Sequence, residues 1–362
     1  MEKKKNILLI LFSILFTLIS LEIFFLVFNK IKNKNQIISN EPGYLLYEQG
    51  EVFQNKDKIV KYHPNKKIKT EAFFKVEDKF IKAYSYEITT NNFGLVQKNN
   101  LKKDLPSILF LGDSFTEGQG QPAWIDKFNG FFKDYQIING GILATGPQQF
   151  ELMEEHISKF YDVKKVFFLF IGHDVRRNPY SISEQQFSCL NNYINCNGNE
   201  IFYGFPLNSK NPEKFLNFLS DTRKQNNLDL SFKKRIKIKI KNFFKNLNIV
   251  KIPHNFLREK FYKSKNVKII KNFKSINNLY QKYKDNIYFV HLLTRNEIIN
   301  GKEYESHYTE KYIRSLTKNY FSCKFENSLQ NYNSLDGHPN KEGYNYLFNC
   351  INRIMNNAIK YN

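Results

Sequence analysis

Short, continuous apolar runs are the clearest pattern in the second half of the chain, and each ends near a polar or glycine-containing turn. Runs of this kind are typical of strands buried in a parallel sheet. They lie at SILFLGDS from Ser107, Gln136–Ile138, Lys165–Ile171 and Asn286–Leu293. Helix-like segments separate the first three runs, and one of them opens after Pro147, as a helix amino terminus often does. Strands that alternate with helices predict an α/β fold with a parallel sheet covered on both faces.

The segments around these runs are more polar. Residues from about 30 to 103 have no long periodic pattern, although YSYEITTNNFGL at Tyr84–Leu95 predicts a short strand and a turn. A long insertion at roughly Pro179–Asp285 separates the third and fourth runs, and its middle, Phe232–Phe261, is densely basic with interleaved aromatic residues. A solvated lid and a segment lying on an anionic membrane both fit that composition. The closing segment, Lys341–Ile359, has a helical apolar stripe that predicts packing on the sheet.

The amino terminus is predicted to be a membrane anchor. Ile7–Phe28 is an almost unbroken apolar run of about the length that crosses a hydrocarbon core. The run exceeds the apolar part of a usual signal peptide, and no small-residue cleavage motif follows before Lys30. An uncleaved transmembrane helix is therefore favoured over a cleaved signal. Glu22 is the single charged residue of the run, and lysines flank it on both sides, so the charge bias leaves the orientation open.

These patterns divide the chain into three parts. Residues 1–34 form the anchor, and residues 35–103 form a lead-in segment that packs on the core. Residues 104–362 form the α/β domain, with the basic insertion at about residues 179–285. A hydrophobic content of 41% is enough apolar material to close such a core.

The net charge of +21 raises nucleic acid as a partner. However, Lys, Asn, Ile, Phe and Tyr are all abundant, and neither zinc-finger spacing nor an aromatic RNA-binding motif accompanies the charge. The charge is therefore attributed to overall composition, and no nucleic-acid partner is expected.

The four cysteines are Cys189, Cys196, Cys323 and Cys350, with no C-x-x-C pair and no histidines at zinc spacing. A structural metal site is not expected from this pattern. Two disulfides, Cys189 with Cys196 and Cys323 with Cys350, and four buried free thiols both remain open at this stage.

Ser114 and His338 are the residues with the clearest catalytic setting. Ser114 lies in GDSFTEG directly after the first apolar run, at the carboxyl edge of the predicted sheet, where open α/β sheets place reactive groups. A serine needs a base to become a nucleophile. Of the seven histidines, only His338 lies in a polar loop, DGHPN, two residues from a carboxylate and just before a helix. The sequence predicts that Asp336 orients His338, which activates Ser114.

Four blocks of the chain resemble those of the SGNH/GDSL hydrolase superfamily, from Ser107 to the carboxyl terminus. GDSFTEG resembles the nucleophile block, and NGG at 139–141 with TGPQ at 145–148 resembles the second block. FIGHD at 170–174 resembles the third block, and DGHPN resembles the last. The stretch TTNNFGL before the first run is similar to the lead-in of membrane-anchored bacterial envelope members.

This resemblance implies a flavodoxin-like three-layer α/β/α sandwich and an oxyanion hole. The amides of Ser114 and Gly141 are the expected backbone donors. The family has an asparagine where this chain has His173, so the third donor would be an imidazole, and loss of such a donor typically lowers the rate by about a hundredfold. Asp113, Arg176 and Asn178 are the candidate substrate contacts in this interpretation.

The resemblance implies a serine esterase that forms an acyl-enzyme on Ser114 and uses neither a cofactor nor a metal. The expected substrate is an O-acetyl or O-acyl ester of an exported carbohydrate or envelope polysaccharide. Transfer of the acyl group to a sugar hydroxyl is the alternative within the same mechanism. A glycan-binding or assembly protein that keeps the hydrolase fold without activity is the alternative of another class. The expected location is the bacterial inner membrane, with one pass and the catalytic domain outside the cytoplasm.

Overall fold

The computed structural model describes residues 12–13, 16–17, 19–24, 43–48, 52–56, 59–122, 124–177, 205–206, 212–228, 267–324 and 328–360. The chain divides into two compact units. One comprises residues 1–38 and 224–265, and the other comprises residues 39–223 and 266–362. The second unit contains Ser114, His338 and both of the large sheets.

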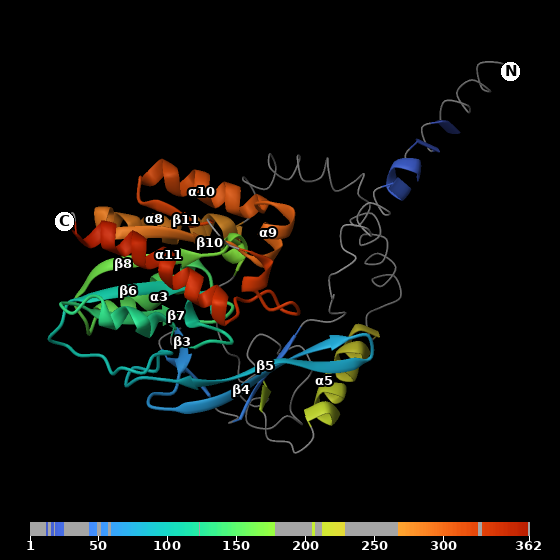
Figure 1. Ribbon diagram of the computed structural model, residues 1–362, viewed down its shortest axis with the longest axis horizontal. Helices are drawn as coiled ribbons and strands as arrows, with labels where there is room; N and C mark the ends of the chain where they lie inside the picture. Colours follow the sequence, from blue (N-terminus) through green and yellow to red (C-terminus); the bar gives the residue numbers. More distant parts are fainter. Residues whose placement is uncertain are drawn as a thin grey trace. The chain divides into compact units, whose positions relative to one another are not determined.

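A five-stranded parallel sheet forms the centre of the second unit (Figure 1). Its strands are β6 (Ser107–Gly112), β7 (Gln136–Gly141), β8 (Val163–Phe170), β10 (Ile287–Leu292) and β11 (Tyr320–Cys323). Their order across the sheet is β11-β10-β8-β6-β7. Counted along the chain this is the order 2-1-3-4-5 of flavodoxin-like folds, so the predicted parallel sheet is confirmed. The strand order reverses between β6 and β8, which is where such sheets bind ligands.

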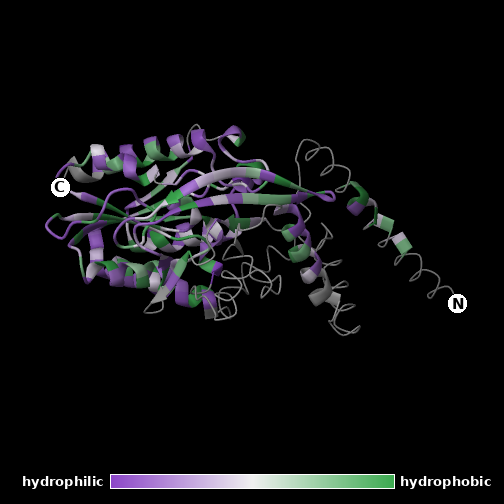
Figure 2. Cartoon of the chain, turned by 90° about the horizontal axis from the view of Figure 1, so that it is seen from below, coloured by the Kyte–Doolittle hydropathy of each residue, from purple (hydrophilic) through white to green (hydrophobic). Residues whose placement is uncertain are grey.

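Helices cover both faces of this sheet because its strands are apolar on both sides. One face packs against α3 (Pro147–Ser158), α8 (Val267–Tyr283) and α10 (Tyr304–Leu316) through residues such as Phe150, Leu279 and Ile313. The other face packs against α11 (Lys341–Lys360) and the 3-10 helix η1 (Trp124–Gly130). Figure 2 shows hydrophilic and hydrophobic residues interleaved along the outer helices, as amphipathic packing requires. The expected three layers are present.

The lead-in segment forms a second sheet, which is more extensive than its sequence predicts. β4 (Lys67–Val76) and β5 (Lys79–Thr89) are a long antiparallel pair, and β1 (Tyr44–Tyr47) and the short β9 (Phe205–Pro206) extend the sheet in the order β5-β4-β1-β9. A separate pair joins β2 (Phe53–Lys56) to β3 (Ile59–Tyr62). Only the second half of β5 was expected as a strand, because lysines interrupt the apolar alternation of β4 and β5.

The two faces of this lead-in sheet have different partners. Tyr44, Leu46 and Phe73 form a small cluster with Phe215, Leu216 and Leu219 of α5 (Pro212–Leu228). The opposite face belongs to the core cluster that also contains β6 and β8. Hydrogen bonds also join the lead-in segment to β7. Gln97 Nε2 donates to the Ile137 carbonyl at 2.7 Å, and the Asn139 N–H donates to Gln97 Oε1 at 3.1 Å. The lead-in sheet is therefore packed on the core.

The predictions for two parts of the insertion have different outcomes. Its last part is α8, a helix of the core that packs on α3 and the sheet, so the insertion is shorter than expected. Its basic middle, Phe232–Phe261, lies outside the described residues.

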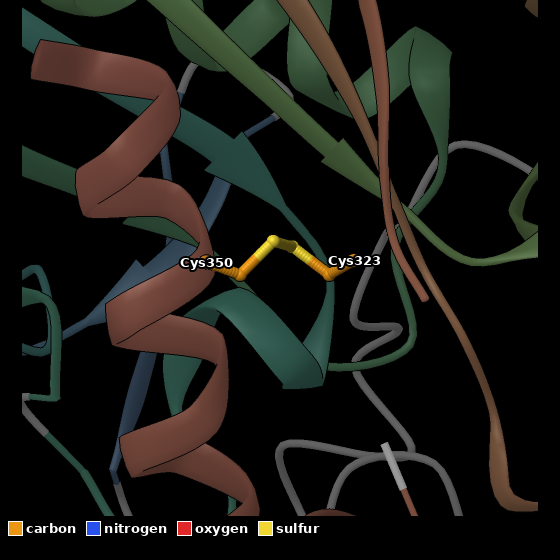
Figure 3. Close-up of a disulfide and its surroundings, with 2 residues drawn as sticks. All are labelled: Cys323 and Cys350. Atoms are coloured by element: carbon orange, nitrogen blue, oxygen red, sulfur yellow. A yellow bond between two sulfur atoms is a disulfide. The ribbon is translucent and has the colours of Figure 1, made fainter. Parts of the chain in front are cut away.

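A disulfide joins Cys323 at the end of β11 to Cys350 in α11, as Figure 3 shows. It links the edge strand of the parallel sheet to the helix that covers one face. The second predicted pair, Cys189 and Cys196, lies outside the described residues.

The first unit is described only in short stretches. The described residues between 12 and 24 are helical, and Thr17 Oγ1 donates to the Ser13 carbonyl at 2.8 Å. In the part of the chain that the structure describes, no helix combines the length and apolar character needed to cross a membrane. Most of the predicted span, Ile7–Phe28, lies outside these residues.

Candidate active site

Ser114 lies directly beyond the carboxyl end of β6, at the first residue of the short helix α2 (Ser114–Glu117). Asp113 caps this helix, because its Oδ1 accepts the Phe115 N–H at 3.0 Å. Gly112 permits the tight turn: a Cβ there would lie 1.9 Å from Thr116 Oγ1. The GDS sequence therefore produces a sharp strand-to-helix turn at the reversal point of the sheet, which places Ser114 at the edge where such sheets carry reactive groups.

His338 and Asp336 return to this point on the loop between η6 (Leu329–Asn331) and α11. Gly337 has a φ of 75°, a conformation that glycine adopts without strain. Ser114 Oγ lies 2.9 Å from His338 Nε2, and His338 Nδ1 lies 2.9 Å from Asp336 Oδ2. The Asp336 Oδ1 atom also accepts the His338 N–H at 2.9 Å. The structure thus brings the three predicted residues together in a serine–histidine–aspartate chain.

The charges of these three residues favour transfer of the Ser114 proton to His338. Burial lowers the pKa of His338, but the charge and hydrogen bond of Asp336 outweigh it, and the net shift is upward. Burial raises the pKa of Asp336, yet the His338 charge and the hydrogen bonds that Asp336 accepts hold this pKa below its usual value. Asp336 is therefore charged at neutral pH and can stabilise an imidazolium on His338.

Tyr84 of β5 adds a contact that the sequence did not predict. Its hydroxyl donates a hydrogen bond to Asp336 Oδ2, and it accepts one from Gln119 Nε2 at 2.7 Å. This donor comes from the lead-in sheet, far in sequence from the blocks that contain Ser114 and His338. Burial and the negative charge of Asp336 raise the pKa of Tyr84 well above its ordinary value, so the hydroxyl keeps its proton.

Arg177 forms a buried ion cluster behind the nucleophile. Its Nη1 atom lies 2.9 Å from Asp113 Oδ2, 2.9 Å from Asp174 Oδ1 and 2.8 Å from the Thr145 carbonyl oxygen. The Asp113 side chain is 1% exposed and fully engaged. Asp113 is therefore a structural cap and ion-pair partner, and its predicted role as a substrate contact is not supported. Arg177, which the sequence did not single out, ties the nucleophile turn to the third sequence block.

The predicted oxyanion donor Gly141 is not free to serve. Its N–H donates to Asn139 Oδ1 at 3.1 Å, and a Cβ at this position would lie 2.4 Å from the Glu117 backbone nitrogen. Gly141 is thus a packing glycine beneath α2. Three residues further along, Ala144 lines the same cavity as Ser114 and has a φ of 58°. Among the described contacts, the backbone N–H groups of Ser114 and Ala144 have no acceptor.

Glu117 holds the loop that carries Ala144. Its Oε2 atom accepts the Leu143 N–H at 2.5 Å, and its Oε1 atom accepts the Tyr62 hydroxyl at 2.8 Å. Burial raises the pKa of Glu117 to about 7. Tyr62 belongs to the lead-in segment, so this segment contacts the supports of both the base and the candidate oxyanion loop.

His173 lies at the start of the 3-10 helix η2 (Gly172–Arg176) and shares a cavity with Ser114. Arg177 Nη2 lies 3.1 Å from His173 Nε2, and a guanidinium can only donate. Burial and the charge of Arg177 lower the pKa of His173 to about 4, so the ring is neutral at neutral pH. Its single proton therefore sits on Nδ1, which lies 4.0 Å from Glu303 Oε2. In this tautomer Nε2 has no proton to offer an oxyanion, and the Nδ1 N–H is the only ring donor left for the predicted role of His173.

The remaining predicted contacts lie apart from the nucleophile or outside the described residues. Arg176 pairs with Glu305 at 3.3 Å and does not line a described cavity with Ser114. Asn178 lies outside the described residues. Within the described part of the chain, no group of three or more His, Cys, Asp or Glu side chains is arranged to hold a metal ion.

Several solved structures are similar to this chain. A GDSL-like lipase from Bacteroides thetaiotaomicron is 14% identical to this chain. The alignment covers 70% of this chain and 89% of the lipase, with a TM-score of 0.32. A lipase/acylhydrolase from Enterococcus faecalis is 10% identical, with coverages of 69% and 94% and a TM-score of 0.35. A family two carbohydrate esterase from Clostridium thermocellum, in complex with cellohexaose, is 9% identical, with coverages of 88% and 100% and a TM-score of 0.36.

No family model matches the chain, and no curated protein matches it. The first of these structures is named as a GDSL-like lipase, the group that the four sequence blocks resemble. At these TM-scores the likeness by itself assigns neither a fold nor an activity to the chain. The parallel strand order and the contacts of Ser114, His338 and Asp336 remain the basis for its functional assignment.

Proposed function

We propose that this protein is a serine ester hydrolase that forms an acyl-enzyme on Ser114. One observation carries the proposal: a continuous hydrogen-bonded chain from Ser114 Oγ through His338 to Asp336, with 2.9 Å at each step. This arrangement supplies a base within reach of an alcohol and a carboxylate that orients the base.

The mechanism follows from these contacts. His338 Nε2 takes the Ser114 proton as Oγ attacks the ester carbonyl, and the backbone N–H groups of Ser114 and Ala144 donate to the developing oxyanion. The imidazolium then protonates the departing alcohol, and the acyl group stays on Ser114. A water molecule, deprotonated by His338, attacks the acyl-enzyme and releases the carboxylic acid. Asp336 remains charged throughout and stabilises the imidazolium.

The proposed substrate is an acyl ester of an exported carbohydrate or envelope polysaccharide. The resemblance of TTNNFGL to the lead-in of envelope-associated members supports this choice. A second support is a cavity beside Ser114 whose walls include the hydrogen-bonding side chains of Arg295, Asn296 and Glu303. Sugar hydroxyls need such donors and acceptors.

The proposed location is outside the cytoplasm, with a single amino-terminal anchor. The Cys323–Cys350 disulfide supports an oxidising compartment, since cytoplasmic thiols are usually kept reduced. The large apolar side chains in the described stretch of residues 12–24, such as Phe12 and Phe16, are exposed, which supports an apolar environment for this stretch.

Labelling with a fluorophosphonate probe tests the proposed activity, because such probes react with activated serines. The unaltered protein should be labelled, and Ser114→Ala should abolish the labelling. Ser315→Ala, which removes an exposed serine of α10, should leave it unchanged. Absence of labelling in the unaltered protein would favour a non-catalytic glycan-binding or assembly role.

Product analysis with an acylated glycan in the presence of excess unmodified glycan then separates hydrolysis from transfer. A hydrolase releases the free acid, whereas an O-acyltransferase moves the acyl group to the second glycan. Hydrolysis is the proposed outcome.

A further inference from the structure

Two cavities meet at the nucleophile, and their walls differ in chemistry. Ser114, His338, Asp336 and Arg177 line both cavities. The first has a volume of about 260 Å³ and is closed by residues of the lead-in sheet. The second has a volume of about 230 Å³ and is closed by residues of η2, α9 (Arg295–Asn300) and the loop before α10. An ester has two sides, an acyl group and an alcohol, so each cavity is available to one of them.

One wall of the first cavity, with Leu45, Ala72 and Phe74, comes from a single face of the lead-in sheet. The pairing of β1 with β4 sets Leu45 opposite Ala72, and the pairing of β4 with β5 sets Ala72 opposite Tyr84. Residues opposite each other in an antiparallel sheet share a face. Tyr84 points from this row to Asp336, so the whole row faces the catalytic residues. Phe74, two residues after Ala72 and also in the cavity wall, completes the apolar surface.

Small residues in this sheet create the space. Ala72 lies between the larger side chains of Leu45 and Tyr84, and Gly43 precedes β1 next to the Phe74 ring. A Cβ at Gly43 would lie 2.4 Å from that ring, so the aromatic wall depends on glycine there. A volume of about 260 Å³ is far more than a single methyl group needs, since one water molecule occupies about 30 Å³ in the liquid.

The second cavity is lined by several side chains that can form hydrogen bonds. Arg295 and Asn296 begin α9, which Thr294 caps by accepting the Glu297 N–H at 3.2 Å, so both side chains are held at a fixed helix start. Glu303 and His173 complete the wall with an acceptor and a neutral imidazole. Hydrogen-bonding groups of both kinds suit an alcohol that carries further hydroxyls.

We propose that the cavity over Ala72 is an acyl pocket for an apolar chain longer than acetyl, and that the alcohol side of the ester lies against Arg295 and Asn296. This inference rests on the proposed function and specifies its acyl group. The lead-in sheet, which supplies no reacting atom, then sets the chain-length preference of the enzyme.

The chain-length profile of the unaltered protein is the first test, with p-nitrophenyl acetate, butanoate, hexanoate and octanoate as substrates. Each methylene that enters an apolar pocket should raise kcat/KM roughly fourfold until the pocket is full. The optimum is therefore expected beyond acetate. A profile that falls steadily from acetate would overturn the inference.

Ala72→Leu is the second test, because Ala72 lines the pocket and the larger side chain takes up part of its volume. It should lower kcat/KM for hexanoate by at least roughly tenfold and affect acetate much less. Ala83→Leu is the matched control, since Ala83 is a partly buried alanine of β5 that does not line the cavity. It should keep the original profile. An equal loss with all four esters in Ala72→Leu would contradict the assignment.

Different results would overturn the acyl pocket and the hydrolase activity. Fluorophosphonate labelling of Ser114 together with an acetate optimum would overturn the acyl pocket and leave the hydrolase intact. Absence of both labelling and ester cleavage would overturn the proposed function itself. If Ala72→Leu does not fold, as judged by thermal unfolding, the profile of the unaltered protein still decides the question.

Discussion

The two large sheets contribute to the candidate site in different ways. The parallel sheet delivers the reacting groups, because Ser114 follows β6 and the loop before α11 returns His338 and Asp336 to the same edge. The antiparallel lead-in sheet supplies no reacting atom, yet its Tyr84 contacts Asp336, and the lead-in residue Tyr62 contacts Glu117. Chemistry and its positioning therefore come from separate parts of the same compact unit. Changes in the parallel sheet should abolish the reaction, whereas changes in the lead-in sheet should tune it.

The largest effect is expected from Asp336→Asn. An amide in place of the carboxylate favours the wrong imidazole tautomer of His338 and no longer stabilises its charged form, so kcat should fall by about 10⁴-fold. Steady-state kinetics on an activated ester measures the loss. Asp162→Asn, which changes an exposed carboxylate paired with Lys164, is the control and should keep full activity. A loss of less than tenfold in Asp336→Asn would remove Asp336 from the catalytic chain.

The next effect concerns stability on the parallel-sheet side. Replacing both Cys323 and Cys350 by serine removes a cross-link with a sequence separation of 27 residues. The free energy of unfolding should fall by about 3 kcal/mol, because the unfolded chain regains the entropy of that loop. Urea unfolding measures the change, and a reducing agent should produce a similar loss in the unaltered protein. Equal stability with and without the bond would show that β11 and α11 are held by packing alone.

Tyr84→Phe tests the contribution of the lead-in sheet. Loss of the hydrogen bond to the charged Asp336 should lower kcat by about tenfold. Without this donor, the negative charge of Asp336 is less compensated and stabilises the protonated form of His338 more strongly. The pKa of His338 should therefore rise further, and the acid limb of the pH profile should move to higher pH. Tyr86→Phe, on the same face of β5, is the matched control and should leave the profile unchanged. A lower kcat with an unmoved acid limb would indicate a purely structural role for Tyr84.

The smallest effect is expected from His173→Ala. Because Nε2 faces Arg177 and carries no proton in the neutral tautomer, its removal should change kcat by less than about threefold, whereas loss of a true oxyanion donor lowers kcat by roughly a hundredfold or more. Kinetics on the same ester separates the two outcomes. A hundredfold loss would restore His173 as the third donor.

The parallel sheet and the catalytic chain were predictable because their signals are local. Continuous apolar runs mark buried strands, and a serine after one run with a histidine before the last helix places both at one edge. Ala144 and Arg177 were missed for a different reason. A left-handed backbone at alanine has no sequence signature, and the partners of Arg177 lie in separate blocks of the chain. Arg177 follows the third block, FIGHD, by three residues, and this position was the one available signal.

The lead-in sheet was the main structural feature that the sequence did not indicate. Lysines along β4 and β5 interrupt the alternation of apolar residues, and Tyr84 lies 252 positions from Asp336. Only the folded chain brings these two side chains together. Specificity elements that depend on such long-range contacts require the structure, whereas the nucleophile and base do not.

The most direct test of the proposed chemistry is the pH dependence of the rate at which a fluorophosphonate labels Ser114. Only the neutral imidazole of His338 accepts the serine proton, so the rate should be low in acid and rise with pH. Since the pKa of His338 is raised above 6.5, the midpoint of a single titration should lie above that value. A labelling rate that stays constant from acid to alkaline pH would contradict the activation of Ser114 by His338.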